Sequence, residues 1–142
     1  MICYFDTSAL VPLLINEPSS EFCRRLWEEA DDVVTTQLLY AEAAAALAQA
    51  LRMGRLVTRN HHSALRILDE TWTEFDIVEI DDDLIRRAAQ LAQTCALRAY
   101  DAVHCASAER LAADDLVVAS GDRKVLEACA ALGMATADTN SP

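Results

Sequence analysis

Four acidic residues stand where an ordinary solvated charge is not expected. Asp6 ends the apolar run "MICYF", and Asp122 follows the apolar run "DLVVAS". Glu42 and Asp101 lie in segments with helical spacing, on the apolar stripe and not opposite it. A carboxylate that faces a core is costly unless it is protonated, paired or bound to a cation. Hard oxygen ligands at this density suit Mg²⁺, with Mn²⁺ as an alternative.

Structural roles also have to be weighed for each of these acids. Asp6 and Asp122 can each cap a following helix, and capping is the simpler explanation for either residue taken singly. Asp101 can lie in the first turn of its helix, where the helix dipole favours a carboxylate. Glu42 has no such explanation, because it is placed away from both ends of its helix and no basic residue lies within one turn.

Neighbouring polar residues support this grouping, and other chemistries fit less well. Ser8 can orient Asp6 by a hydrogen bond, while Ser120 can orient a carboxylate or simply end a strand. His104 is expected to be a hydrogen-bonded interior histidine and not a ligand. The sequence has no glycine-rich phosphate loop, no nucleophile elbow and no Cys/His pair at zinc spacing.

The elements that must position these acids alternate between strand and helix. Strands are predicted at residues 2–5, 32–36, 76–80 and 115–120. Helices are predicted at 19–30 (capped by Ser19 or Ser20), near Ser8, at 37–54 (ending at Gly54), 59–75, 82–96, 100–113 and 122–132 (ending at Gly133). This order predicts an α/β fold with a mostly parallel central sheet flanked by helices. Ligands of such folds bind beyond the carboxyl ends of the strands, where Asp6 and Asp122 fall.

Composition limits the protein class. The chain has 142 residues, 53% of them hydrophobic, and no linker or repeat divides it, so one domain over residues 1–142 is expected. The net charge of −11 argues against a broad basic surface for nucleic acid. The cysteines show no CxxC pair, which favours a reduced, cytoplasmic protein. No apolar stretch approaches the ~20 residues needed to span a bilayer, so no membrane association is expected.

Four motifs together resemble the PIN-domain family, and most closely its VapC-type toxins from toxin–antitoxin pairs. They are "FDTSAL", "TQLLYAE", "LRAYDAVHCASA" and "VVASGDRKV", in the family's order and over essentially the whole chain. The resemblance implies a three-layer PIN-like fold and a metal-dependent endoribonuclease. It also implies an acidic quartet of Asp6, Glu42, Asp101 and Asp122, with Ser8 and Ser120 as polar support. Many relatives carry Thr where Ser120 stands, and the fourth acid is the least constant, so Asp122 is the least secure ligand.

The mechanism expected from the residues and the resemblance is hydrolysis of an RNA phosphodiester by metal-activated water. Asp6, Asp101 and either Glu42 or Asp122 would hold one or two Mg²⁺ ions, without a covalent intermediate. Two alternatives remain open. One is a catalytically idle PIN-like module for RNA binding or assembly, and the other is a Mg²⁺-dependent phosphohydrolase of small phosphate esters.

Partners are implied by the same resemblance. A VapB-type antitoxin would inhibit the enzyme with a basic segment, with an Arg reaching the acids, and a homodimer is expected as well. We expect that segment to enter an apolar groove lined by residues 10–15 and 22–27. The clustering of apolar side chains there is equally compatible with a plain core.

Overall fold

One sheet organises the molecule. The computed structural model of the chain describes residues 1–111 and 113–142. The sheet is five-stranded, has the order β3-β2-β1-β4-β5, and all of its pairings are parallel. Its strands are β1 (Ile2–Phe5), β2 (Asp32–Thr36), β3 (Asp76–Val78), β4 (Leu116–Ser120) and β5 (Ala135–Asp138). The predicted mostly parallel sheet is therefore confirmed.

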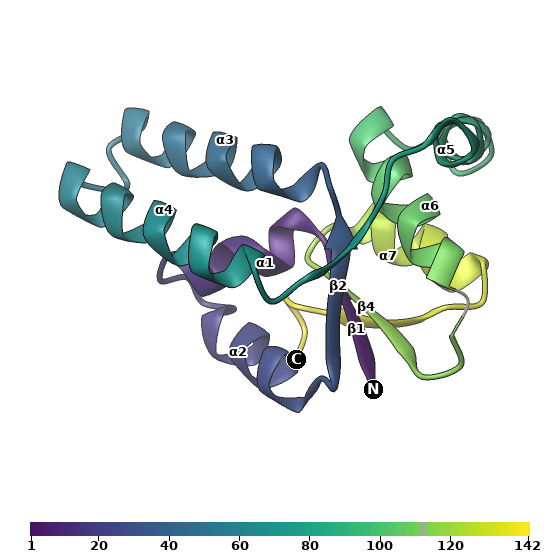
Figure 1. Ribbon diagram of the computed structural model, residues 1–142, viewed down its shortest axis with the longest axis horizontal. Helices are drawn as coiled ribbons and strands as arrows, with labels where there is room; N and C mark the ends of the chain where they lie inside the picture. Colours follow the sequence, from purple (N-terminus) through teal and green to yellow (C-terminus); the bar gives the residue numbers. More distant parts are fainter. Residues whose placement is uncertain (112) are drawn as a thin grey trace.

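Helices cover both faces of the sheet and give three layers (Figure 1). One face carries α1 (Thr7–Leu14), α2 (Ser20–Glu29), α3 (Leu39–Arg52) and α4 (Thr58–Trp72). The other face carries α5 (Asp82–Thr94), α6 (Ala99–Leu111) and α7 (Arg123–Ala131). None of the described helices combines the length and the apolar character needed to cross a membrane.

The side chains of β1 point alternately to the two faces of the sheet and so contribute to two separate cores. Successive side chains of a strand point to opposite faces, and both faces of this sheet are buried. Cys3 and Phe5 pack into the core under α1–α4, whereas Tyr4 packs into the core under α5–α7. All three side chains are fully buried, so this short apolar strand lies between two cores. Asp6 directly follows Phe5, the last residue of the strand.

The boundaries of most predicted elements agree with the structure within a few residues. Two other features differ from the prediction, namely an additional strand and the cap of α2. Strand β5 was not predicted, because it is short and its first two residues are exposed, so it lacks the apolar run of a buried strand. Ser19 precedes α2, but its side chain makes no capping hydrogen bond. The hydroxyl of Ser20 accepts a hydrogen bond from Glu17 N and donates one to Ile15 O, which stabilises the turn between α1 and α2. The predicted end of the sixth helix includes residue 112, which lies outside the described residues.

Two glycines end helices as predicted. Gly54 follows α3 with φ +75°, and Gly133 follows α7 with φ +88°. This left-handed conformation is accessible to Gly at little steric cost, and it terminates a helix.

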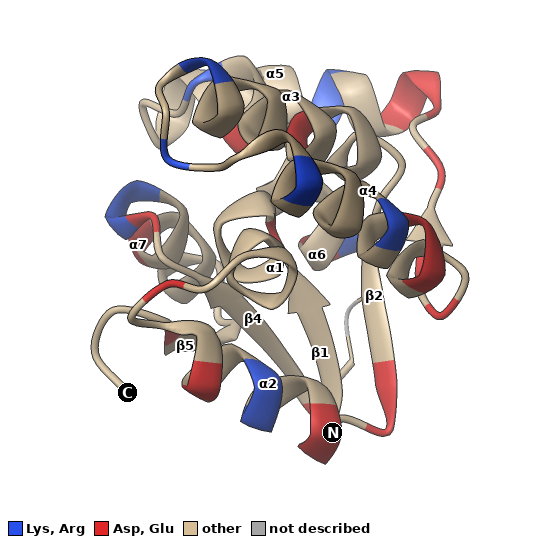
Figure 2. Cartoon of the chain, turned by 90° about the vertical axis from the view of Figure 1, so that its left-hand side faces the viewer, with Lys and Arg blue, Asp and Glu red and all other residues tan. Residues whose placement is uncertain are grey.

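The charged residues show a different pattern. Acidic and basic segments are interspersed over the helices seen in Figure 2, and no labelled helix in that view is uniformly basic.

Candidate functional site

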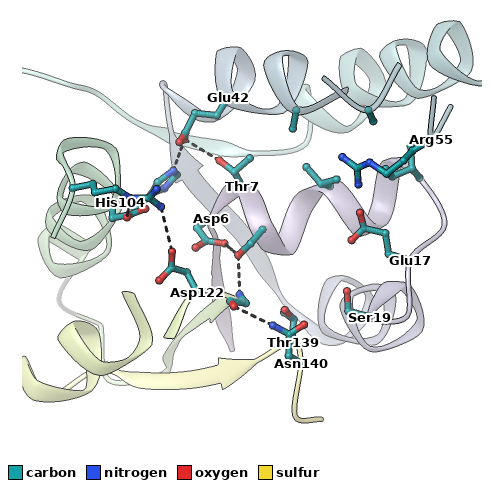
Figure 3. Close-up of a pocket in the computed structure, with 18 residues that line it drawn as sticks. Asp6, Thr7, Glu17, Ser19, Glu42, Arg55, His104, Asp122, Thr139 and Asn140 are labelled. Atoms are coloured by element: carbon teal, nitrogen blue, oxygen red, sulfur yellow. Dashed lines mark hydrogen bonds and ion pairs between the residues drawn. The ribbon is translucent and has the colours of Figure 1, made fainter. Parts of the chain in front are cut away.

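A cavity of about 440 Å³ lies at the carboxyl ends of β1, β4 and β5, and all four predicted acids line it (Figure 3). Asp6 follows β1, Asp122 follows β4, and Glu42 and Asp101 come from α3 and α6. Acids 21 (Asp101 and Asp122) to 116 (Asp6 and Asp122) positions apart in the sequence are therefore brought to one place by the parallel topology. The remaining lining residues are Thr7, Ser8, Val11, Ile15, Glu17, Ser19, Ala46, Ala50, Arg55, Arg98, His104, Gly121, Thr139 and Asn140.

Each of the four acids belongs to the start of a helix. Asp6 caps α1 by accepting from Ala9 N at 3.2 Å, and Asp122 caps α7 by accepting from Lys124 N at 2.9 Å. Asp101 lies in the first turn of α6. Helix N-termini favour negative charge. The capping explanation and the shared site therefore hold together, and the helix dipoles reduce the repulsion within the cluster.

Glu42 corrects one expectation. It was placed away from both ends of its helix, but α3 begins at Leu39, so Glu42 lies in the first turn. The predicted start at residue 37 was too early, because Gln37 and Leu38 form the turn that leaves β2. The N-cap residue Leu38 has no side chain that can accept a hydrogen bond, so no capping signal marks the boundary.

Asp6 is the most enclosed of the acids, with 4% of its surface exposed. Its Oδ1 accepts from Ser8 Oγ at 2.6 Å, and its Oδ2 accepts from Ser120 Oγ. Burial raises the pKa of Asp6 above its ordinary value, while the nearby imidazole of His104 and the two serine hydroxyls act in the opposite direction. The predicted support from Ser8 and Ser120 is thus present as direct hydrogen bonds to Asp6.

The pKa of Asp6 gives a prediction for the metal-free protein. Because the folded-state pKa is raised, stability falls as the pH rises from the ordinary value of 3.8 through the raised pKa. Asp6→Asn carries no charge, so we expect the variant to be more stable than the wild type at neutral pH. The difference should vanish below pH 3.8, where the wild-type carboxyl is protonated in both states. Thermal unfolding in EDTA across a pH series measures this, and a difference that stays constant with pH would contradict it.

Glu42 is held through one carboxylate oxygen. Thr7 Oγ1 donates to Oε1 at 2.8 Å, and His104 Nε2 lies 2.5 Å from the same oxygen. His104 is buried and its Nδ1 lies 2.8 Å from the hydroxyl of Tyr4. The histidine is therefore an interior, hydrogen-bonded residue, as predicted, but its partner belongs to the site.

Arg98 is a cation that the sequence analysis did not assign to the site. Its Nε donates to Asp101 Oδ2 at 3.1 Å, and its terminal nitrogen lies 3.7 Å from Asp122 Oδ2. The hydrogen bond to Asp101 raises the pKa of Arg98 above its ordinary value. Because 81% of its side chain is exposed, this guanidinium is worth little as a surface ion pair.

The donor set fits a hard divalent cation by its chemistry, since carboxylate oxygens dominate the polar lining. Within residues 1–111 and 113–142, no three acid, His or Cys side chains stand close enough to hold an ion between them. Arg98 stands at two of the carboxylates that a cation would use. A cation bound there would therefore compete with the guanidinium.

The loop between β4 and α7 is tightly packed beside the acids. Gly121 N donates to Ser8 Oγ at 2.7 Å, and its carbonyl accepts from Asn140 Nδ2 at 3.0 Å. A Cβ at position 121 would lie 2.8 Å from Thr139 Oγ1 and 3.1 Å from Asn140 Nδ2. Glycine is thus required here for close approach of the segment that follows β5.

Gly121→Ala is expected to destabilise the protein by about 1–3 kcal/mol, the usual cost of overpacking. Thr139 is buried, so its hydroxyl cannot simply swing away from the new methyl group. The double variant Gly121→Ala/Thr139→Ala removes the obstructing atom and should recover part of the loss relative to Thr139→Ala alone. Urea denaturation measures all three variants. Equal losses for Gly121→Ala in both backgrounds would show that Thr139 is not the obstacle.

The sequence analysis did not identify several of the residues that line the cavity. Thr139 and Asn140 follow β5, so the rule of strand carboxyl ends identifies them only once that strand is known. Arg98 lies three residues before Asp101, a spacing at which opposite charges meet on a helix, and that signal was available. Thr7 directly follows Asp6 and shows no pattern of its own.

The groove for a partner segment stays a prediction, and its expected lining meets the cavity at two residues. Val11 of α1 and Ile15, the C-cap residue after that helix, line the cavity beside the acids. Phe22 and Trp27 pack against the core under α1–α4, and Leu10 and Leu26 are buried in it. For residues 22–27 the core explanation therefore describes the structure better.

Comparison with known proteins gives consistent matches. Residues 3–131 match the PIN domain family. The chain is 38% identical over 124 residues to Ribonuclease VapC45 of Mycobacterium tuberculosis, which covers 87% of this chain and 86% of that protein. Its fold resembles FitAcB from Neisseria gonorrhoeae, with a TM-score of 0.72, 20% identity and full coverage of both chains. It also resembles VapBC-5 from Mycobacterium tuberculosis, a member of the VapBC family of toxin–antitoxin systems, with a TM-score of 0.65, 21% identity and coverage of 96% and 98%.

Proposed function

The chain belongs to the PIN-domain family, with VapC ribonucleases among its relatives, and from this premise we propose that it is a Mg²⁺-dependent endoribonuclease. We propose further that it is the toxin of a type II toxin–antitoxin pair and that residues 1–142 act as a single domain in the cytoplasm. The observation that carries the proposal is the convergence of four carboxylates, each at a helix start, on one cavity.

Asp6, Glu42, Asp101 and Asp122 are the proposed holders of the metal, with Mn²⁺ as a possible substitute. A bound divalent cation supplies charge neutralisation for the phosphate and a lowered pKa for water. Ser8 and Ser120 keep the carboxylate of Asp6 in one orientation. The hydroxyls of Ser8 and Thr7 donate to Asp6 and Glu42, so they serve as hydrogen-bond donors and not as nucleophiles. Water is therefore the proposed nucleophile.

An antitoxin is the proposed protein partner, by analogy with the VapBC-5 relative. The acids of the cavity and the net charge of −11 favour a basic segment. An Arg from that segment would satisfy carboxylates by paired hydrogen bonds. Within the chain, Arg98 donates one hydrogen bond to Asp101 and lies 3.7 Å from Asp122. A homodimer is proposed as well, and size-exclusion chromatography with light scattering tests it.

The activity is tested by incubating the purified protein with RNA and, separately, with a small phosphate ester such as p-nitrophenyl phosphate. We expect RNA to be cut in Mg²⁺ and to stay intact in EDTA, with the ester unchanged in both. Hydrolysis of the ester with intact RNA would instead assign a small-molecule phosphohydrolase. An intact RNA and ester in Mg²⁺ would indicate a binding module.

The antitoxin is tested by co-expression with the small protein encoded beside this chain, followed by chromatography and the RNA assay. We expect a stable complex whose RNA cleavage is suppressed and then restored when the partner is removed by denaturation and refolding. A partner that co-purifies but leaves cleavage undiminished would contradict the inhibitory role.

A further inference from the structure

A line of hydrogen bonds connects the core under α5–α7 with the cavity. The hydroxyl of Tyr4 on β1 lies 2.8 Å from His104 Nδ1, and His104 Nε2 lies 2.5 Å from Glu42 Oε1. Tyr4 has no exposed surface and His104 has 3%. Figure 3 shows His104 and Glu42 facing one another across the cavity wall, from α6 and α3.

The chemistry of these groups gives the hydrogen bonds a direction. A carboxylate oxygen only accepts, so the hydrogen of the His104–Glu42 bond resides on Nε2. Nδ1 of the neutral imidazole is then an acceptor, and the Tyr4 hydroxyl is placed to donate to it. Burial raises the pKa of Tyr4 well above its ordinary value, so the phenol keeps its hydrogen.

The two donors to Glu42 act on the same oxygen from different elements. His104 approaches Oε1 from α6, and Thr7 approaches it from the first residue of α1. Among the hydrogen bonds of the described residues, none reaches Oε2. A carboxylate anchored at one oxygen by two donors has its rotation restricted, and its second oxygen is left to the cavity.

We propose that Tyr4 and His104 are positioning residues that hold Glu42 by Oε1 and present Oε2 to the metal and substrate. The proposal rests on the proposed function, in which Glu42 helps to hold the divalent cation. His104 acts through Glu42 and not as a ligand, because its Nε2 is already directed at the carboxylate. Tyr4 acts one step further away, by fixing which imidazole nitrogen carries the hydrogen.

Tyr4→Phe is the sharpest test, because it removes one hydroxyl and keeps the buried ring. We expect the affinity for Mn²⁺, measured by calorimetry, and kcat for RNA each to fall, by less than the about 10- to 100-fold that follows loss of a direct partner of a metal ligand, because Tyr4 acts through His104. KM for RNA should not change. The control is Cys105→Ala, a truncation at the neighbouring buried position of α6, which faces Cys129 and not the site. It should leave Mn²⁺ affinity at the wild-type level.

Position 104 supplies a second, independent arm. His104→Leu removes the direct partner of Glu42 and should lower Mn²⁺ affinity by about 10- to 100-fold, more than Tyr4→Phe does. His104→Gln retains an N–H donor and should recover part of this loss. Unchanged Mn²⁺ affinity in both Tyr4→Phe and His104→Leu would overturn the proposal.

Nitrogen NMR of the metal-free protein tests the line of hydrogen bonds from Tyr4 through His104 to Glu42 independently of enzyme activity. We expect the hydrogen of wild-type His104 on Nε2, with a weaker preference for that tautomer in Tyr4→Phe. A wild-type ring with its hydrogen on Nδ1 alone would refute the positioning role of Tyr4 and His104, even if RNA is cut. A protein that neither binds Mn²⁺ nor cuts RNA would instead refute the proposed function, whatever the state of the ring.

Discussion

RNA cleavage is expected to fall by more than about a hundredfold in Asp101→Asn and in Asp6→Asn, while both variants stay folded. The reason for the size is that even residues that only support metal ligands change activity by about 10- to 100-fold, and these two carboxylates are proposed to act directly. The fold should persist because Asn can still cap α1 in place of Asp6, and because Asn has the same shape as Asp in the first turn of α6.

The matched control for this experiment is Asp114→Asn, which removes one carboxylate charge from an exposed position outside the cavity. Cleavage should then stay at the wild-type level, and circular dichroism should show the same helix content in all variants. Near-wild-type cleavage by either Asp101→Asn or Asp6→Asn would remove that residue from the proposed site.

The second large effect concerns the cation. Mg²⁺ or Mn²⁺ should raise the melting temperature of the wild type, since an ion that binds only the folded state at one hundred times its Kd contributes about 2.7 kcal/mol. Arg98→Ala should shift this titration to lower ion concentrations. The guanidinium that stands 3.1 Å from Asp101 and 3.7 Å from Asp122 is then absent, and its competition with the ion is lost.

Arg86→Ala is the control for Arg98→Ala. Arg86 also pairs with an Asp close to it in sequence, Asp82, but that pair lies on α5 away from the cavity. Its removal changes the net charge by the same amount and should leave the midpoint of the titration close to that of the wild type. Equal midpoints for the Arg98 and Arg86 variants would show that the ion binds elsewhere or that its attraction is only a matter of net charge.

The acids were predictable because each of them ends an apolar run or lies on an apolar stripe of the sequence, where a solvated charge is not expected. Asp6 ends an apolar strand, and an unpaired carboxylate is expensive at such a position. The α/β alternation then placed Asp6 and Asp122 at the same edge of a parallel sheet, which the structure confirms. The metal-holding role of the four acids remains a prediction of the residues and the family.

The hydrogen-bond partners were not predictable in the same way. His104 and Glu42 are 62 residues apart, and no local periodicity encodes a contact between two helices. Tyr4 looked like an ordinary core residue, because burial of an aromatic ring in a strand is common and its hydroxyl leaves no trace in the pattern. Strand β5 escaped because exposed edge strands lack an apolar run, and Thr139 and Asn140 were missed with it.

The measurement that tests the central claim most directly is cleavage of a defined RNA in water labelled with oxygen-18, followed by mass spectrometry of the new ends. Hydrolysis at the acidic cavity predicts labelled oxygen in the terminal phosphate and no 2′,3′-cyclic phosphate. It also predicts that cleavage disappears in EDTA and returns with added Mg²⁺. Cyclic phosphate ends, or cleavage that continues in EDTA, would show that the RNA 2′-hydroxyl is the nucleophile or that no cation takes part, and either result would contradict the account.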